Sequence, residues 1–158
     1  MKDRINCHLI KAIIHYKGMW ERFYQFGERT TREEFWYAYF AHATISIVFR
    51  WLASAIGFGY VFSFYLFVSF VPFAAMHVRR LHDVGKSSKV LFIPAILLVI
   101  SLLLFFAGIF SLPFLAIAGV CGFAALASSF FIIMLLIRPG VKGSNKYGPE
   151  PLLPEINL

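Results

Sequence analysis

Residues 90 to 137 read VLFIPAILLVISLLLFFAGIFSLPFLAIAGVCGFAALASSFFIIMLLI, which is 48 residues without an Asp, Glu, Lys or Arg. A helix rises about 1.5 Å per residue, so crossing a hydrocarbon core of about 30 Å takes about 20 apolar residues. The stretch is therefore long enough for two crossings. Gly108, Ser111 and Pro113 mark the turn between them, because Gly weakens a helix end and Pro opens the next helix without losing a needed hydrogen bond.

A second apolar region precedes this stretch in the sequence. Residues 36 to 49 and 51 to 78 are also free of Asp, Glu, Lys and Arg and are separated by Arg50, and a turn with two glycines falls near residues 54 to 60. With 59% hydrophobic and 15% charged residues, the chain is far too apolar for a soluble domain. We predict an all-α membrane protein with four transmembrane helices in two hairpins, at about residues 35–54, 60–79, 89–109 and 113–137.

Basic residues predict the orientation of these helices. Seven Lys and Arg precede residue 36, four lie between residues 79 and 89, and three follow residue 137. Four crossings place all three basic segments on one face, which the positive-inside rule makes cytoplasmic. We therefore expect a cytoplasmic N-terminal segment (1–34), a transmembrane domain (35–137) and a cytoplasmic tail (138–158). The net charge of +7 then serves orientation and contact with anionic headgroups, and we expect no nucleic-acid partner.

The N-terminal segment has the pattern of an amphipathic helix. Its apolar residues recur three or four apart, while its basic residues take other faces. A helix of this kind lies on the membrane surface or packs on the cytoplasmic loops of its own chain, and the sequence leaves both interpretations open. The recurring apolar residues are Ile5, Leu9, Ile13, Tyr16, Trp20 and Phe23.

A charged turn before the first crossing has two interpretations. Thr30 or Thr31 is suited to cap the helix, because a hydroxyl accepts from the free N–H groups of a first helical turn. Glu33 and Glu34 complement the positive helix end. The alternative is that the arginines of this turn bind a phosphate or a partner carboxylate, and local roles for each residue favour the structural interpretation.

The loop after the second crossing concentrates several side-chain chemistries. Arg79, His82 and Asp83 fall within one helical turn, and Gly85 is placed to end the helix in a left-handed conformation. The spacing of its histidines does not suit helical metal ligands, and a catalytic His82 and Asp83 pair lacks a visible nucleophile. A structural polar cluster is the favoured interpretation. We expect no cofactor and no metal.

The tail contains too many Gly and Pro residues for a helix, and we expect its Asn and Tyr side chains to anchor it. Three polar blocks are found along the chain: Arg29-x-x-Arg32-x-Glu34-Phe35-Trp36, Arg79-Arg80-Leu81-His82-Asp83-x-Gly85-Lys86-Ser87 and Gly143-x-Asn145-Lys146-Tyr147-Gly148-x-x-Pro151. Through these blocks the chain resembles the DUF805 family of small bacterial inner-membrane proteins. Glu28 stands where the first block usually has Gly, and Ser88-Lys89 replaces a usual Gly-Trp after the second. The resemblance implies a four-helix protein of the bacterial inner membrane whose biochemical role is undefined.

All three blocks fall on the predicted cytoplasmic face, so we expect one composite polar cluster in which Asp83 pairs with Arg29 or Arg32. The favoured function is a non-enzymatic module that binds anionic lipid or a protein partner, such as a second copy or another membrane protein. A small transporter or channel is disfavoured, because no predicted helix contains Asp or Glu at mid-membrane. A membrane-interface enzyme using His82 and Asp83 is the remaining alternative. The candidate site residues are Arg29, Arg32, Glu34, Arg79, Arg80, His82, Asp83, Lys86, Asn145 and Tyr147.

Overall fold

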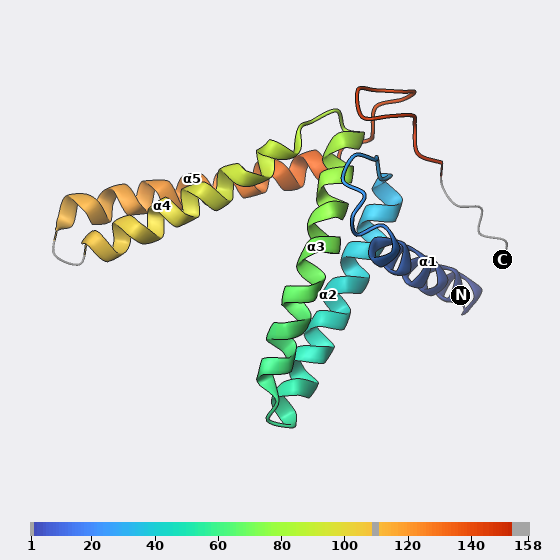
Figure 1. Cartoon of the computed structure of the whole chain (residues 1–158), viewed down its shortest axis with the longest axis horizontal. Helices are drawn as coiled ribbons and strands as arrows, with labels where there is room; N and C mark the ends of the chain where they lie inside the picture. The colour runs from blue at the N-terminus through green and yellow to red at the C-terminus, as the bar shows by residue number, and fades with distance from the viewer. Residues whose placement is uncertain (1, 109–110, 153–158) are drawn as a thin grey trace. The chain divides into compact units, whose positions relative to one another are not determined.

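The computed structural model describes residues 2–108 and 111–152, with side chains from residue 5 onward, and the described chain is helical without a named strand. It forms two compact units, one made of the described residues up to Gly85 and from Pro139, the other of Lys86–Arg138 (Figure 1). The first unit holds three helices and the tail, and the second holds a helical hairpin. The helices are α1 (Lys2–Glu21), α2 (Arg32–Ala55), α3 (Gly59–Asp83), α4 (Phe92–Gly108) and α5 (Leu112–Ile137), with a 3-10 turn at Ser88–Leu91.

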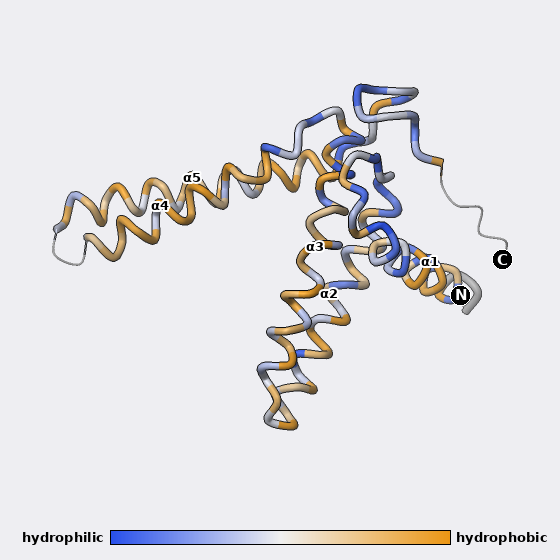
Figure 2. Tube along the Cα trace, viewed as in Figure 1, coloured by the Kyte–Doolittle hydropathy of each residue, from blue (hydrophilic) through white to orange (hydrophobic). Residues whose placement is uncertain are grey.

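Three of the described helical segments are long and apolar enough to cross a membrane. They are Gly59–Asp83, Ser88–Gly108 and Leu112–Ile137, with mean hydropathies of 1.8, 3.0 and 2.5. Figure 2 shows hydrophobic residues along these helices and hydrophilic ones in the tail and before α2. The all-helical membrane architecture predicted from the sequence is confirmed. A crossing by α2 stays a prediction, because charges at its start and Arg50 lower its apolarity.

The caps of the first hairpin follow the predicted chemistry. The Thr31 side chain accepts a hydrogen bond from the Glu34 backbone N–H at 3.1 Å, which confirms the predicted cap of α2. A turn with Gly57 at φ +75° joins α2 to α3. At the other end of α3, Gly85 has φ +73°, the left-handed conformation predicted for it.

The helix ends extend beyond the predicted membrane segments. We expected the first hairpin to begin at residue 35 and to end at residue 79, but α2 begins at Arg32 and α3 continues to Asp83. Low charge identifies the part of a helix that lies in hydrocarbon, whereas the helix itself continues into the polar region. The helices are therefore longer than the predicted membrane segments, whose bounds these helix ends do not test. The extra turn of α3 is the turn that carries Arg80, His82 and Asp83.

Helix α1 lies across α2 (Figure 1), and its aliphatic residues are exposed. Ile5, Leu9 and Ile13 are 61%, 59% and 59% exposed, whereas His15 and Met19 are buried. A helix on a soluble protein buries its aliphatic face and exposes its polar one. The opposite arrangement suits a helix whose outer surroundings are apolar.

Small residues pack the hairpin of the second unit. The Ser101 hydroxyl of α4 donates to the Ala118 carbonyl of α5 at 2.8 Å. A Cβ added at Gly122 would lie 3.2 Å from the Ser101 hydroxyl oxygen. Ala118 and Ala125 are both buried. Small residues of α5 therefore lie at its contact with α4.

Candidate functional site

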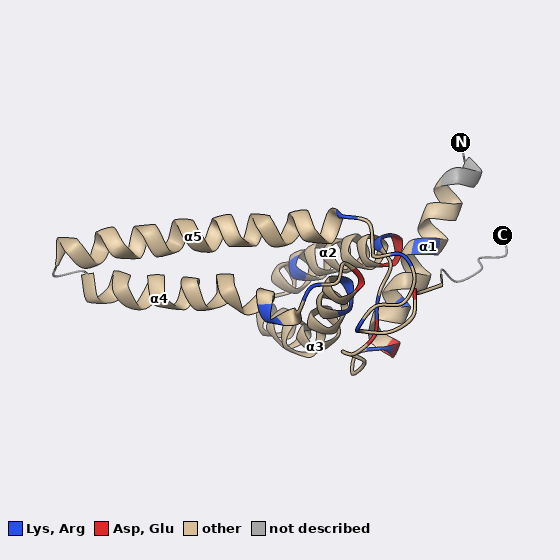
Figure 3. Cartoon of the chain, turned by 90° about the horizontal axis from the view of Figure 1, so that it is seen from above, with Lys and Arg blue, Asp and Glu red and all other residues tan. Residues whose placement is uncertain are grey.

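Three segments far apart in the sequence meet at one end of α2 and α3. They are the turn before α2, the last turn of α3 and the tail, all in the first unit. Figure 3 shows acidic and basic residues gathered around this end. We call the contact the clasp, and define it by Arg29, Arg79, Arg80, Asp83 and the tail carbonyls of Val141, Gly143 and Gly148.

An ion pair between Arg29 and Asp83 forms the centre of the clasp. The Arg29 Nε and Nη2 atoms donate to Asp83 Oδ1 at 3.1 and 3.0 Å. The two side chains are only 1% and 5% exposed. Of the two partners predicted for Asp83, the structure selects Arg29. A buried pair of this geometry depends on both partners, because either charge alone would be desolvated without compensation.

The same guanidinium holds the tail. Arg29 Nη1 donates to the Gly143 carbonyl at 2.6 Å and to the Gly148 carbonyl at 3.3 Å, and Nη2 donates to the Val141 carbonyl at 2.5 Å. With the bonds to Asp83, these use every N–H direction that a guanidinium offers. Arg29 therefore links α3 to the tail through one rigid group.

The two arginines at the end of α3 are also buried. Arg80 Nη1 donates to Asp83 Oδ2. Arg79 Nε donates to the Thr30 hydroxyl at 3.1 Å, and Arg79 Nη1 donates to the carbonyls of Arg22 and Gln25. Within the described residues, no carboxylate lies within ion-pair distance of Arg79. All of its described direct hydrogen-bond acceptors are neutral oxygens.

Ring stacking and amide bonds seat the tail beside the clasp. The rings of His82 and Tyr147 stack with centroids 3.8 Å apart and planes 5° from parallel. Asn145 Nδ2 donates to the His82 carbonyl at 3.0 Å, and the Val141 N–H donates to the Asp83 carbonyl at 2.8 Å. The predicted anchoring of the tail by its Asn and Tyr is confirmed.

The clasp carries an excess of positive charge. Its defining side chains are three buried arginines and one aspartate, which pairs with Arg29 and Arg80. Glu34 does not correct this balance, because it pairs with Arg22. No group of three or more His, Cys, Asp or Glu that suits a metal ion occurs in the described part of the chain.

The structure places the predicted site residues in three ways. It brings most of them into the clasp or into the contacts that hold the tail beside it. Glu34 lies at its edge with Arg22. Arg32 is exposed, and so is Lys86, which belongs to the second unit. The residues brought together are Arg29, Arg79, Arg80, His82, Asp83, Asn145 and Tyr147.

Sequence reasoning missed Gly140. A Cβ built at this position would overlap the Asp83 carboxylate, with its centre 2.6 Å from Asp83 Cγ. The tail backbone thus lies so close to the ion pair that only glycine fits at this position. In the sequence, Pro139-Gly140 predicts a turn and gives no sign of what the turn approaches.

Comparison with known proteins identifies the family. The model of a family described as "Protein of unknown function (DUF805)" matches residues 23–149. The chain belongs to the DUF805 family. Inner membrane protein YhaI of Escherichia coli K12 is 24% identical over 138 residues, covering 86% of this chain and 93% of the relative. YhaI of E. coli O157:H7 matches to the same extent. No solved structure matches the chain.

The family match contains every clasp residue, from Arg29 to Gly148. Together with the three apolar helices, the similarity to an inner membrane protein makes this DUF805 member an integral, multi-pass protein of the inner membrane. The resemblance drawn from its three polar blocks is confirmed.

Proposed function

We propose that the chain crosses the inner membrane four times with both termini in the cytoplasm, and that its cytoplasmic face binds anionic lipid headgroups. The observation that carries this proposal is the clasp. Arg29 of the turn before α2 bonds directly to Asp83 at the end of α3 and to backbone carbonyls of the tail.

The clasp supports an even number of crossings between its segments. Groups in direct contact lie on one side of a bilayer, so the chain must return to that side between Arg29 and Asp83. Because α3 is apolar enough to cross once, α2 is the helix available for the other crossing. In the same way, α4 and α5 make a pair between Asp83 and Val141. This reasoning supports α2 as the fourth crossing despite its lower apolarity.

Surface charge supports a cytoplasmic clasp and an anionic ligand. Arg32, Lys142 and Lys146 are exposed in the first unit, and Lys86 and Lys89 in the second. Basic residues flanking crossings are retained in the cytoplasm. Each contributes about 1 kcal/mol of attraction to an anionic membrane surface. The excess positive charge of the buried clasp acts in the same direction.

The topology is tested with alkaline phosphatase fusions, which are active only in the periplasm. We expect activity for an insertion at Gly57, in the turn between α2 and α3, and none for a fusion after Leu158. Activity of the C-terminal fusion, or its absence at Gly57, would contradict four crossings with this orientation.

Lipid binding is tested on the full chain by native mass spectrometry after mild delipidation. The double variant Lys142→Gln/Lys146→Gln removes exposed charge without touching the ion pair. We expect it to retain less phosphatidylglycerol than wild type. Arg50→Gln is the matched control, because Arg50 is an exposed residue near the other end of α2. Equal retention by wild type and both variants would count against the basic face as the binding surface.

A further inference from the structure

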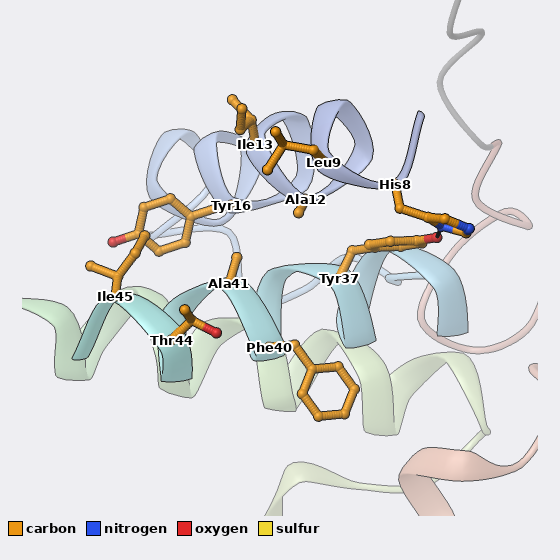
Figure 4. A pocket seen from close by; sticks show the side chains of 10 residues that line it. All are labelled: His8, Leu9, Ala12, Ile13, Tyr16, Tyr37, Phe40, Ala41, Thr44 and Ile45. Carbon is orange, nitrogen blue, oxygen red and sulfur yellow. Dashed lines mark hydrogen bonds between the residues drawn. The ribbon is translucent and has the colours of Figure 1, made fainter. Parts of the chain in front are cut away.

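A groove in the first unit lies between α1 and α2 and continues along α2 (Figure 4). It consists of two hollows of about 440 and 430 Å³ that share Thr44 and Ile45. The first is lined by α1 and α2, and the second by α2 and Tyr65 of α3. We call the two together the α1–α2 groove.

Small residues and aromatic contacts produce the groove. In Figure 4, Ala12 of α1 and Ala41 of α2 point toward one another across the gap. At one end, His8 Nδ1 and the Tyr37 hydroxyl are 2.5 Å apart. Toward the other end, the Tyr16 hydroxyl lies 3.3 Å from the Tyr65 hydroxyl. These larger side chains separate the helices, and the alanines leave the space between them unfilled.

The groove is mainly apolar along its length and polar at one end. From Ala41 to Leu52 its lining is aliphatic and aromatic except for Thr44. At the other end, His8 and the Tyr37 hydroxyl form a hydrogen-bonding pair, beside which Lys11 pairs with Glu33 at 2.6 Å. An apolar trough with a hydrogen-bonding end matches an amphiphile with a hydrocarbon chain and a polar headgroup.

We propose that the α1–α2 groove holds one hydrocarbon chain of a phospholipid, with the headgroup at the His8 and Tyr37 end. From Tyr37 to Leu52 the groove follows α2 for about 22 Å, which fits within a hydrocarbon core of about 30 Å. The inference rests on the proposed crossing by α2. It does not rest on binding of anionic headgroups by the basic face.

The surroundings of the groove favour a hydrocarbon chain as its occupant. The exposed aliphatic face of α1 continues the apolar wall outward, so lipid hydrocarbon is the medium that reaches the groove.

The test uses the full chain in nanodiscs with phosphatidylglycerol that carries a diazirine in its acyl chain. Crosslinks are mapped by mass spectrometry. We expect labelling of residues 8–16 and 37–45 at least about threefold above that of Phe123 and Leu126 on α5, which are 74% and 72% exposed and report ordinary contact with lipid. Labelling of the groove at the level of α5, or crosslinks from the groove to a second copy, would overturn the proposal.

Filling the groove provides the matched comparison. Ala41→Phe, and independently Ala12→Phe from the α1 side, should reduce labelling of the groove to the α5 level. Ala55→Phe makes the same change at an exposed position of α2 outside the groove and should leave labelling unchanged. Unchanged labelling in both filled variants would reject the site. If neither variant folds, the comparison of groove and α5 labelling in the wild-type chain decides whether the proposal holds.

A second probe separates this inference from the proposed function. Phosphatidylcholine with the same diazirine chain has no net charge. If it labels the groove as strongly as phosphatidylglycerol, the chain site stands and the anionic preference loses support. If phosphatidylglycerol is retained in native mass spectrometry while the groove stays unlabelled, the lipid binds elsewhere and the groove proposal fails.

Discussion

The clasp and the α4–α5 hairpin are stabilised by different kinds of contact. In the clasp, buried charged side chains bond to specific partners. Arg29 by itself bonds to Asp83 of α3 and to three tail carbonyls. In the hairpin, helices approach closely at Ala118, Gly122 and Ala125, with one hydroxyl bond from Ser101.

The difference predicts how each region responds to substitution. Loss of one partner in the clasp leaves another charge buried and uncompensated, so the cost is large and depends on chemical identity. Loss of a contact between packed helices in lipid costs little, because the separated helices find alternative partners. Side-chain charge should therefore decide stability in the clasp, and side-chain volume in the hairpin.

Removal of the Asp83 carboxylate should have the largest effect. Asp83→Ala leaves Arg29 and Arg80 buried without their carboxylate and should cost about 3 to 5 kcal/mol. For a chain of this size that lowers the melting temperature in detergent by about 6 to 20 °C. Asp83→Asn should do nearly as much harm, because it keeps the shape and loses the charge. Lys142→Ala, at an exposed tail position, should be nearly silent. A melting temperature for Asp83→Ala within about 1 °C of wild type would show that the carboxylate is not needed.

Gly140→Ala should have the next largest effect. The added methyl group would overlap the Asp83 carboxylate and push the tail backbone away from the ion pair. We expect a loss of about 1 to 3 kcal/mol, measured by thermal melting. Gly27→Ala is the control, since nothing lies within 4 Å of a Cβ added there. Equal melting of the two variants would mean that the tail does not approach Asp83 this closely.

Ser101→Ala should have a smaller effect in the hairpin. It removes the hydroxyl bond to the Ala118 carbonyl but preserves the small volume between α4 and α5. Hydrogen bonds between helices in lipid contribute about 0.6 kcal/mol on average, so we expect a loss of that size. A loss as large as that of Asp83→Ala would remove the contrast between the two regions.

The pH dependence of α1 packing should be the mildest effect. Burial lowers the pKa of His15 below its usual 6.5, against the opposing effect of Glu33, while Lys11 and Arg22 also lower it. The folded state then binds the proton less readily than the unfolded state, so the stabilisation is complete above pH 6.5 and is lost as the pH falls below it. Hydrogen exchange of α1 amides, corrected for intrinsic rates, should increase at pH 5.5 relative to 7.5, and His15→Gln should remove the change. The described residues of α5 contain no histidine and serve as the internal reference. Equal changes in α1 and α5 would contradict a role for His15.

Hydropathy was sufficient to predict the helices in lipid but not their polar ends. Charge-free stretches located α3, α4 and α5 because a bilayer requires about 20 apolar residues. Hydropathy did not predict the helical turn of α3 after residue 79, because its charged residues are stabilised by other side chains and not by burial in lipid.

The clasp was partly predictable. Order and polarity of the three blocks indicated that they would meet, and Asp83 was expected to pair with one of two arginines. The choice of Arg29 over Arg32 depends on which side of the α2 start faces α3, which sequence spacing does not determine. The burial of Arg79 could not be predicted from the sequence either, because the acceptors of its hydrogen bonds are mainly backbone carbonyls.

The face that α1 turns toward the protein was likewise undetermined by its pattern. Periodicity found the aliphatic residues, but in a bilayer these can face outward, which reverses the usual interpretation. The polar inner contacts with Glu33 and Tyr37 are visible only in the structure.

A double-mutant cycle on Arg29 and Asp83 tests the central claim most directly. The free energy of unfolding would be measured for wild type, Arg29→Ala, Asp83→Ala and the double variant in the same detergent. If the two side chains form the buried pair that connects the turn before α2 to α3, their losses should not add, and the coupling energy should be about 1 to 3 kcal/mol. A coupling within about 0.5 kcal/mol of zero would contradict the pair and, with it, the argument for four crossings.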